Sequence, residues 1–362
     1  MHKYARFHSG PNFALPPHNG AVVVLFRSIR LLPPTRLPLS TVLVTGCAGF
    51  IGSHLCERLL RDGYRVVGLD NFDPFYPRAI KEANLAAFAG HPHFTFHEAD
   101  LRHGPAALPQ VTVDVVVHLA AKAGVGPSVQ DPAAYLENNV LGTGHLLEWM
   151  RLGGSSKLFF ASSSSVYGNA PEQPFREDAN TLATCISPYA ATKLAGEQLV
   201  HTYHHLYQLD ALNARFFTVY GPRQRPDLAI HKFVRLLRAG QAIPVFGDGS
   251  TARDYTFVAD TVDGIARGVR YLLAHTGVFE TVNLGNNNPV PLLKLIAAVG
   301  HAVGVRPELT FQPMQPGDVD ITFADISKAQ NLFGYAPQTS LAEGLRQFVA
   351  WLPAASEVAV SE

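Results

Sequence analysis

Short apolar runs alternate with stretches of helical periodicity from residue 41 onward. The runs are rich in β-branched residues and almost continuously apolar, which is typical of strands covered on both faces. We expect strands at 42–45, 65–69, 94–98, 113–119, 158–161 and 212–217, with helices at 53–61, 138–152 and 187–207. Repeated strand–helix–strand units predict an α/β fold in which a doubly wound parallel sheet carries helices on both faces.

The pattern changes after Gly221, where prolines interrupt shorter elements. The elements expected there are helices at 230–239, 260–273 and 342–351, and a strand at 254–258. Because that strand and the helix after it repeat the earlier unit, this part should rejoin the first domain. The predicted division is an extension over 1–40, a first domain over 41–221 rejoined by 254–274, a smaller mixed α/β lobe over 222–353, and a tail over 354–362.

The two ends of the chain differ from the rest. The first forty residues are rich in proline and basic residues, and the first acidic residue is Glu57. Their apolar core, residues 21–26, is too short for a secretory signal. We expect residues 1–40 to be a flexible extension or the product of an early translation start, with a transit peptide as the alternative. Residues 354–362 should be disordered.

Composition narrows the class of protein. Hydrophobic residues make up 47% and charged residues 16%, as in a folded globular protein. Lysine plus arginine and aspartate plus glutamate number 29 each, which argues against nucleic-acid and membrane-surface partners. The three cysteines, Cys47, Cys56 and Cys185, lack metal-ligand spacing and indicate a reducing cytoplasm. No apolar run reaches the ~18–20 residues of a membrane span.

A glycine turn separates the first strand from the first helix. Gly46, Gly49 and Gly52 would let the backbone approach a pyrophosphate at the helix N-terminus, although a purely structural turn is the alternative. Asp70 closes the second strand. A carboxylate there accepts hydrogen bonds from ribose hydroxyls and repels a 2′-phosphate, which predicts NAD as the cofactor rather than NADP. An ordinary aspartate at a strand end is the other interpretation.

Tyr189 and Lys193 lie four residues apart in a helix for which Ser187 and Pro188 are good first residues. On one helical face, the lysine ammonium would lower the pKa of the phenol toward neutrality and make it a general base. A surface aromatic–lysine pair is the alternative. Upstream, a buried strand ends in four serines, 162–165, where ligands bind in parallel sheets.

Together these motifs resemble extended short-chain dehydrogenases/reductases of the NAD-dependent epimerase/dehydratase type. The segments that carry the resemblance are the glycine turn, Asp70, Asp100, Leu101, 118–121, 162–165, Tyr189, Lys193 and 215–222. The resemblance covers residues 41–351. It implies a Rossmann domain that binds NAD and a C-terminal lobe that binds a nucleoside-diphosphate sugar.

The resemblance also assigns residues to roles. It implies Ser163 as the catalytic hydroxyl, Tyr189 as the base and Lys193 as its partner. The cofactor residues would be Gly46, Gly49, Phe50, Ile51, Gly52, Asp70, Asp100, Leu101, Leu119, Ala120, Ala121, Asn139, Tyr189 and Lys193. The substrate residues would be Ser163, Ser164, Ser165, Thr218, Arg225, Val245, Phe246 and Arg253.

Two further features concern the substrate site and a possible metal site. Segments 245–249 and 253–255 resemble a uridine-diphosphate site, but Gln315 stands where many relatives have an arginine that contacts the diphosphate. Arg225 or Lys232 would have to compensate. We expect no metal site: the spacing of His201, His204 and His205 is helical, yet no carboxylate or cysteine completes a ligand set, so they should line a helix surface.

Residues 164 and 165 favour one reaction within the family. Related 4,6-dehydratases carry Asp-Glu where Ser164 and Ser165 stand, and UDP-glucuronate decarboxylases carry glutamate at the position of Ser165. We therefore expect 4-epimerisation of a UDP-sugar through a 4-keto intermediate, most like UDP-glucuronate 4-epimerases, which form UDP-galacturonate. Ser164, Ser165 and Thr218 would hold the C6 carboxylate. A UDP-glucose/galactose 4-epimerase is the alternative, followed by decarboxylase, dehydratase and a non-catalytic NAD sensor. The resemblance also implies a homodimer that packs through helices 138–152 and 187–207.

Overall fold

A seven-stranded parallel sheet forms the larger part of the molecule. The computed structural model describes residues 39–179, 184–314 and 319–352. The strands, in spatial order, are β10 (Phe279–Leu284), β6 (Asp210–Phe216), β5 (Lys157–Ser163), β4 (Val115–His118), β1 (Thr41–Thr45), β2 (Arg65–Asp70) and β3 (Phe94–Glu98). Because the order runs outward from β1 on one side and from β4 on the other, these two strands flank the switch point where ligands of such sheets bind.

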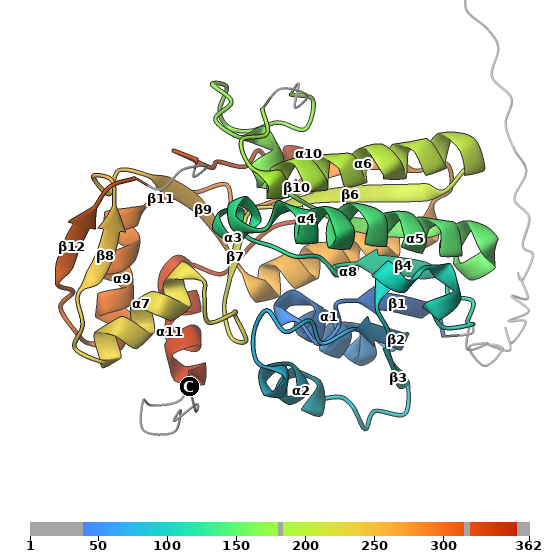
Figure 1. The fold of residues 1–362 in the computed structure, drawn as a ribbon, viewed down its shortest axis with the longest axis horizontal. Coiled ribbons are helices and arrows are strands. Elements are labelled where there is room, and N and C mark those ends of the chain that lie inside the picture. Colours follow the sequence, from blue (N-terminus) through green and yellow to red (C-terminus); the bar gives the residue numbers. More distant parts are fainter. Residues whose placement is uncertain (1–38, 180–183, 315–318, 353–362) are drawn as a thin grey trace, which may run out of the picture. The chain divides into compact units, whose positions relative to one another are not determined.

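Helices cover both faces of this sheet, as the continuous apolar strands predicted. Val42 and Val44 of β1 pack with α1 (Phe50–Arg61) and α8 (Val258–Ala274). Leu43, between them, points to the opposite face, where α5 (Gly142–Trp149) and α6 (Pro188–Tyr207) lie. Figure 1 shows α5 and α6 side by side along the sheet. The predicted doubly wound parallel sheet is confirmed.

A smaller mixed α/β part follows β6. Its strands are β7 (Thr218–Tyr220), β9 (Ala252–Phe257) and β11 (Pro289–Pro291) in one sheet, and β8 (Ile243–Phe246) and β12 (Leu309–Gln312) in another. The helices α7 (Ala229–Arg238), α9 (Leu292–Val303) and α11 (Leu341–Trp351) pack with these strands (Figure 1). The remaining helices are α2 (Arg78–Ala86), α3 (Val125–Gln130), α4 (Pro132–Tyr135) and α10 (Ser327–Phe333).

Some elements differ from the sequence prediction. The helix expected at 138–152 has π-helical turns at Leu136–Leu141 and Met150–Gly154 on either side of α5. Strand β10, which the pattern did not indicate, pairs in parallel with β6 and extends the main sheet. Helix α8 packs on β5 and β6, but the domain boundaries themselves stay a prediction. The expected extension, except for residues 39 and 40, and the expected tail lie outside the described residues.

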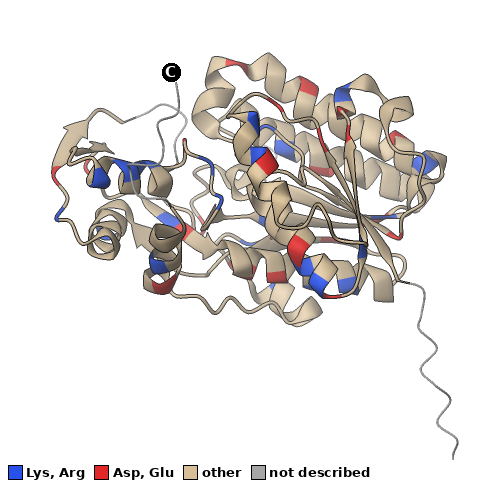
Figure 2. Ribbon diagram, turned by 90° about the horizontal axis from the view of Figure 1, so that it is seen from below, with Lys and Arg blue, Asp and Glu red and all other residues tan. Residues whose placement is uncertain are grey.

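Charges of both signs are distributed over the described chain. Figure 2 shows basic and acidic residues interspersed, often on the same helix. Several of them pair across one helical turn, as Arg58 does with Asp62 and Arg267 with Asp263. Among the described helices, none has the length and apolar character needed to cross a membrane.

Candidate active site

The glycine turn between β1 and α1 has a geometry that only glycine fits. Gly46 has a positive φ of 73°, and a Cβ there would lie 2.9 Å from the nitrogen of Ala120. A Cβ on Gly52 would lie 2.0 Å from the Gly46 carbonyl oxygen. Among the described residues, no side chain caps the N-terminus of α1, so its first N–H groups and its positive dipole end are free to meet an anion.

A cavity of about 320 Å³ opens beside this turn, at the switch point of the sheet. It is within the usual range for small-molecule sites. The predicted site residues that line it are Gly46, Gly49, Phe50, Ile51, Gly52, Asp70, Asp100, Leu101, Leu119, Ala120, Ala121, Ser163, Tyr189, Lys193 and Arg225. The fold therefore brings most of the predicted cofactor residues and all three candidate catalytic residues to one cavity.

Asp70 is buried at the end of β2, where it lines the cavity. Its two carboxylate oxygens accept the N–H groups of Ala48 at 3.1 Å and of Phe72 at 2.8 Å. Burial raises its pKa, whereas Lys81, whose Nζ lies 3.8 Å away, and the two N–H groups act in the opposite direction. A carboxylate held in this way has lone pairs left for ribose hydroxyls, so the glycine turn and Asp70 together fit the adenosine half of NAD.

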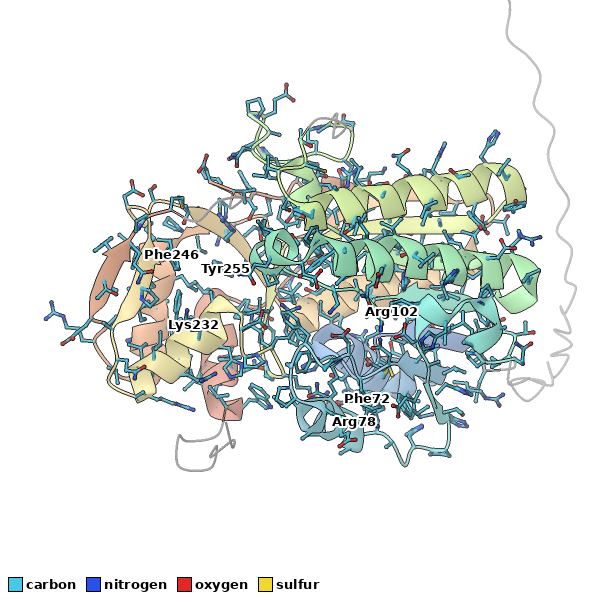
Figure 3. The ribbon with its side chains drawn as sticks, in the orientation of Figure 1. Phe72, Arg78, Arg102, Lys232, Phe246 and Tyr255 are labelled. Atoms are coloured by element: carbon cyan, nitrogen blue, oxygen red, sulfur yellow. The ribbon has the colours of Figure 1, made fainter. Side chains whose placement is uncertain are left out.

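Asp100 lies on the same rim, at the start of a short 3-10 turn. Its carboxylate accepts hydrogen bonds from Arg102 and from Asn71, and the Arg102 guanidinium holds its pKa well below the usual range. Both partners line the cavity, although neither was among the predicted site residues. Figure 3 shows Arg102 in the same half of the molecule as Phe72 and Arg78, whose guanidinium lies 4.0 Å from the Phe72 ring.

The candidate catalytic residues come from β5 and α6. Ser163 is the last residue of β5, and its Oγ accepts hydrogen bonds from the backbone N–H of Ser165 at 3.2 Å and from its hydroxyl at 2.9 Å. Ser187 caps α6 by accepting the N–H of Ala190 at 3.2 Å, so the helix begins as predicted. This start places Tyr189 in the wall of the cavity that Ser163 also lines.

The predicted lowering of the Tyr189 pKa is not present in this state. Burial raises the pKa of Tyr189, and the neighbouring Ser163 hydroxyl opposes that effect only in part. Lys193 instead donates from Nζ to the Ala161 carbonyl at 2.9 Å, and burial lowers its pKa to about 8. The prediction was wrong because i,i+4 spacing fixes which face the two residues share, but not how far both are removed from water.

Asn139 has a supporting position rather than a place in the cavity wall. It is 2% exposed, and its amide accepts the N–H of Lys122 at 2.8 Å. The amide also donates to the Lys122 carbonyl and to the hydroxyl of Thr192, each at 3.0 Å. Asn139 therefore ties the cavity loop at Lys122 to α6, whereas its neighbour Asn138 lines the cavity.

The three hydroxyls expected to hold a carboxylate do not line this cavity. Ser164 is buried, and the hydroxyl of Ser165 donates to Ser163. Thr218 lies between Phe217 and Val219, which do line it. A direct contact of these hydroxyls with substrate stays a prediction.

Arg225 reaches the cavity from the loop after β7. Its guanidinium donates to the Ala123 carbonyl at 3.1 Å and to Asp227 at 2.8 Å, and it lies 4.9 Å from the centre of the Phe75 ring. The arginine thus connects two cavity-lining loops that are far apart in sequence.

The expected uridine-diphosphate residues lie in the smaller part of the molecule, outside the cavity. Val245 is fully buried in the core and does not line the cavity, so its contact with substrate stays a prediction. Arg253 donates to the carbonyls of Ala252 at 2.9 Å and Asp320 at 3.2 Å. Figure 3 shows Phe246 and Lys232 in this part, away from Phe72 and Arg102. Gln315 and residues 316–318 lie outside the described residues.

The histidines of α6 take no part in the cavity. His201 and His204 pack against the ring of Phe279, at 5.1 and 4.9 Å between ring centres. In the described ranges, no three His, Cys, Asp or Glu side chains are placed to hold a metal ion.

The loop that follows Asp70 also lines the cavity, although it was not among the predicted site segments. Phe75, Tyr76 and Lys81 line the cavity from this loop and from α2. The loop is built from successive turns in which Asp70, Asn71 and Asp73 each accept the N–H two residues on, at 2.8, 2.9 and 3.0 Å. The closely spaced Asp and Asn residues after β2 were the signal for it.

Known proteins share this architecture. The family model described as GDP-mannose 4,6 dehydratase matches residues 43–348. UDP-glucuronate 4-epimerase of Thermodesulfobacterium geofontis is 40% identical over 85% of this chain and 95% of its own. UDP-glucuronate 4-epimerase 2 of Arabidopsis thaliana is 38% identical over 86% of this chain and 75% of its own.

Solved structures agree with these matches. UDP-glucuronic acid 4-epimerase from Bacillus cereus, in complex with UDP-glucuronic acid and NAD, superposes with a TM-score of 0.80 at 36% identity, covering 86% of this chain and 98% of that one. UDP-glucose 4-epimerase from Thermotoga maritima gives a TM-score of 0.77 at 30% identity over 86% and 98%. The chain therefore belongs to the extended short-chain dehydrogenase/reductase family, in the group that the GDP-mannose 4,6 dehydratase model describes.

Proposed function

We propose that this protein is an NAD-dependent UDP-sugar 4-epimerase that interconverts UDP-glucuronate and UDP-galacturonate. One observation carries the proposal: Ser163, Tyr189 and Lys193 line the cavity that fits NAD, and neutral serines, not carboxylates, follow Ser163. The relatives from T. geofontis and B. cereus, which bear the name of this activity, support the choice of substrate.

The roles of the catalytic residues follow from their positions. NAD, when bound, would supply the hydride acceptor for the sugar C4. Tyr189 takes the proton of the C4 hydroxyl and later returns it, while Ser163 orients that hydroxyl. Because burial raises the pKa of Tyr189, we expect the phenol to act as a base only when positive charge stabilises the phenolate.

The serines after Ser163 favour epimerisation over elimination or decarboxylation. Dehydration needs an acid and a base at C5 and C6, and Ser164 and Ser165 are neutral at working pH. We propose that they and Thr218 donate hydrogen bonds to the C6 carboxylate and hold it out of line with the C4 carbonyl. The hydroxyl of Ser165, which donates to Ser163, would turn about its Cβ–Oγ bond to do so.

We also propose that the protein is a homodimer. Large apolar side chains are exposed on or beside the two helices expected to meet a symmetry mate. They are Leu136, Leu141, Leu152, Leu206 and Tyr207. Burying these side chains in a two-fold interface would remove them from water. All three cysteines are free, which supports a cytoplasmic location.

Product analysis tests the function directly. The purified protein is incubated with UDP-glucuronate and, separately, with UDP-glucose, and the products are followed by proton NMR. We expect UDP-galacturonate to appear without net reduction of NAD and without a pentose product. Epimerisation of UDP-glucose alone would replace this proposal by the UDP-glucose/galactose alternative.

A further inference from the structure

A buried carboxylate lies behind the candidate catalytic residues. Glu197 is on α6, four residues after Lys193 and eight after Tyr189, so all three lie on adjacent turns of one helix face. It is 5% exposed and belongs to neither the cavity wall nor the hydrophobic clusters. A buried carboxylate needs a full set of partners, and those of Glu197 indicate what it does.

One of these partners is the strand that carries the catalytic serine. Ser162 donates from Oγ to Glu197 Oε1 at 2.5 Å. Ser162 precedes Ser163, the last residue of β5, and it lines the cavity. The carboxylate therefore fixes the backbone at the point from which the Ser163 hydroxyl projects.

The other partner is an arginine on the neighbouring strand. Arg215 of β6, which is paired with Ser162 in the sheet register, donates from Nε to Oε1 at 2.9 Å and from Nη2 to Oε2 at 2.8 Å. This two-pronged contact allows one orientation of the carboxylate. The guanidinium also lies 4.8 Å from the centre of the Tyr167 ring, which holds it in turn. The carboxylate is thus locked between helix and sheet.

We propose that Glu197 is a positioning residue for the active site, acting on Ser163 through Ser162 and on Lys193 through its negative charge. The inference rests on the catalytic roles proposed above for Ser163 and Lys193. A contact that only tied α6 to the sheet would need the arginine alone. The hydrogen bond to Ser162 and the place of Lys193 one turn away give the carboxylate two routes to the reacting groups.

The charge of Glu197 changes the pKa of Lys193 in a definite direction. Burial lowers the pKa of Lys193 to about 8, and the charge of Glu197 is the effect that opposes this lowering. The other groups around the pair are Tyr189 on the same helix, His118 on β4, Arg215 on β6 and Cys185 before α6. Without the carboxylate, Lys193 would lose its proton at a lower pH. Activity on the alkaline side of the pH–rate profile should therefore fall at a lower pH.

Glu197→Gln tests the effect of the Glu197 charge on Lys193, and Ser162→Ala tests the positioning of Ser163 through Ser162. We expect Glu197→Gln to move the alkaline limb of the pH–rate profile down by about one unit. The pH at which Lys193 becomes reactive toward acetic anhydride, followed by mass spectrometry, should fall equally. We expect Ser162→Ala to lower kcat about 10-fold with KM and the alkaline limb unchanged. Glu343→Gln is the matched control, because Glu343 also receives a two-pronged arginine contact, from Arg346, but lies exposed on α11.

The possible outcomes test the electrostatic part of the proposal and its positional part independently. A wild-type alkaline limb and labelling midpoint in Glu197→Gln would overturn the electrostatic part, and wild-type turnover in Ser162→Ala would overturn the positional part. Glu197→Gln could fail to fold because it leaves Arg215 buried and unpaired. In that case Ser162→Ala, which keeps the pair of Arg215 and Glu197, tests the positioning role. If the wild type ignores UDP-glucuronate, the proposed function fails, while the labelling of Lys193 still tests this inference.

Discussion

Replacing Asp70 with asparagine tests how this protein selects its cofactor. The carboxylate is fixed by the N–H groups of Ala48 and Phe72 at the part of the cavity where we place the adenosine ribose. A charged acceptor adds about 1 kcal/mol to a hydrogen bond relative to a neutral one. With two ribose hydroxyls involved, the substitution should weaken NAD binding by about 2 kcal/mol, or roughly 30-fold in Kd.

NADP binding should change in the opposite direction. Two unit charges about 5 Å apart repel by about 3 kcal/mol at an effective dielectric constant of about 20, and Asp70→Asn removes that repulsion of a 2′-phosphate. Lys81, 3.8 Å from the carboxylate, would be left as an unpaired cation that attracts the phosphate. The ratio of the Kd for NADP to that for NAD should therefore fall by more than about 100-fold.

Calorimetric titration of the cofactor-free protein with each dinucleotide measures the ratio. Asp114→Asn is the control, because Asp114 also accepts a backbone N–H, that of Thr41 at 2.7 Å, but at the far end of β1. The lost acceptor in Asp70→Asn should cost about 1–3 kcal/mol of unfolding free energy, which thermal unfolding detects. Equal affinity of the wild type for both dinucleotides, or an unchanged ratio in the variant, would refute the role given to Asp70.

Four further predictions follow from the site and the surface. Tyr189→Phe should lower kcat by roughly 10²–10⁴ while substrate binding stays near wild type, and near wild-type turnover would contradict the assignment of the base. Gly52→Ala should abolish NAD binding in the same titration and lower the unfolding free energy by about 1–3 kcal/mol, because its Cβ would meet the Gly46 carbonyl oxygen at 2.0 Å. Thr218→Ala should slow turnover of UDP-glucuronate more than that of UDP-glucose and release some carbon dioxide, which wild-type product analysis should not show. Leu206→Arg should shift a sedimenting dimer to monomer at micromolar concentration; a wild-type monomer would contradict the dimer itself.

Local geometry explains why much of the site was predictable. The glycine turn depends on backbone conformations and close approaches within a few residues, so Gly46 and Gly52 indicated it directly. The start of α6 depends on a capping serine and a proline, and the helical period then places Tyr189 and Lys193 on one face. The parallel sheet was evident for a similar reason, since strands covered on both sides must be continuously apolar.

Contacts between distant segments needed the tertiary structure. The pairing of β10 with β6 joins residue 279 to residue 211, and no local pattern specifies that partner. The contacts of Arg225 with Phe75 and Ala123 likewise depend on how separate loops meet at the cavity. The sequence pattern indicated neither β10 nor the loop that carries Phe75, and it could not show which segments become neighbours.

The charged state of the site shows most clearly what the sequence determined and what only the tertiary structure decided. Sequence spacing by itself determined that Tyr189 and Lys193 share a helix face. Only the fold decided that Lys193 donates to the Ala161 carbonyl and that Arg215 holds Glu197 in place. The fold also decided that burial raises the pKa of Tyr189, where Lys193 was predicted to lower it. Ionisation depends on how much water and which charges surround a group in three dimensions, and both are set by segments far away in the chain.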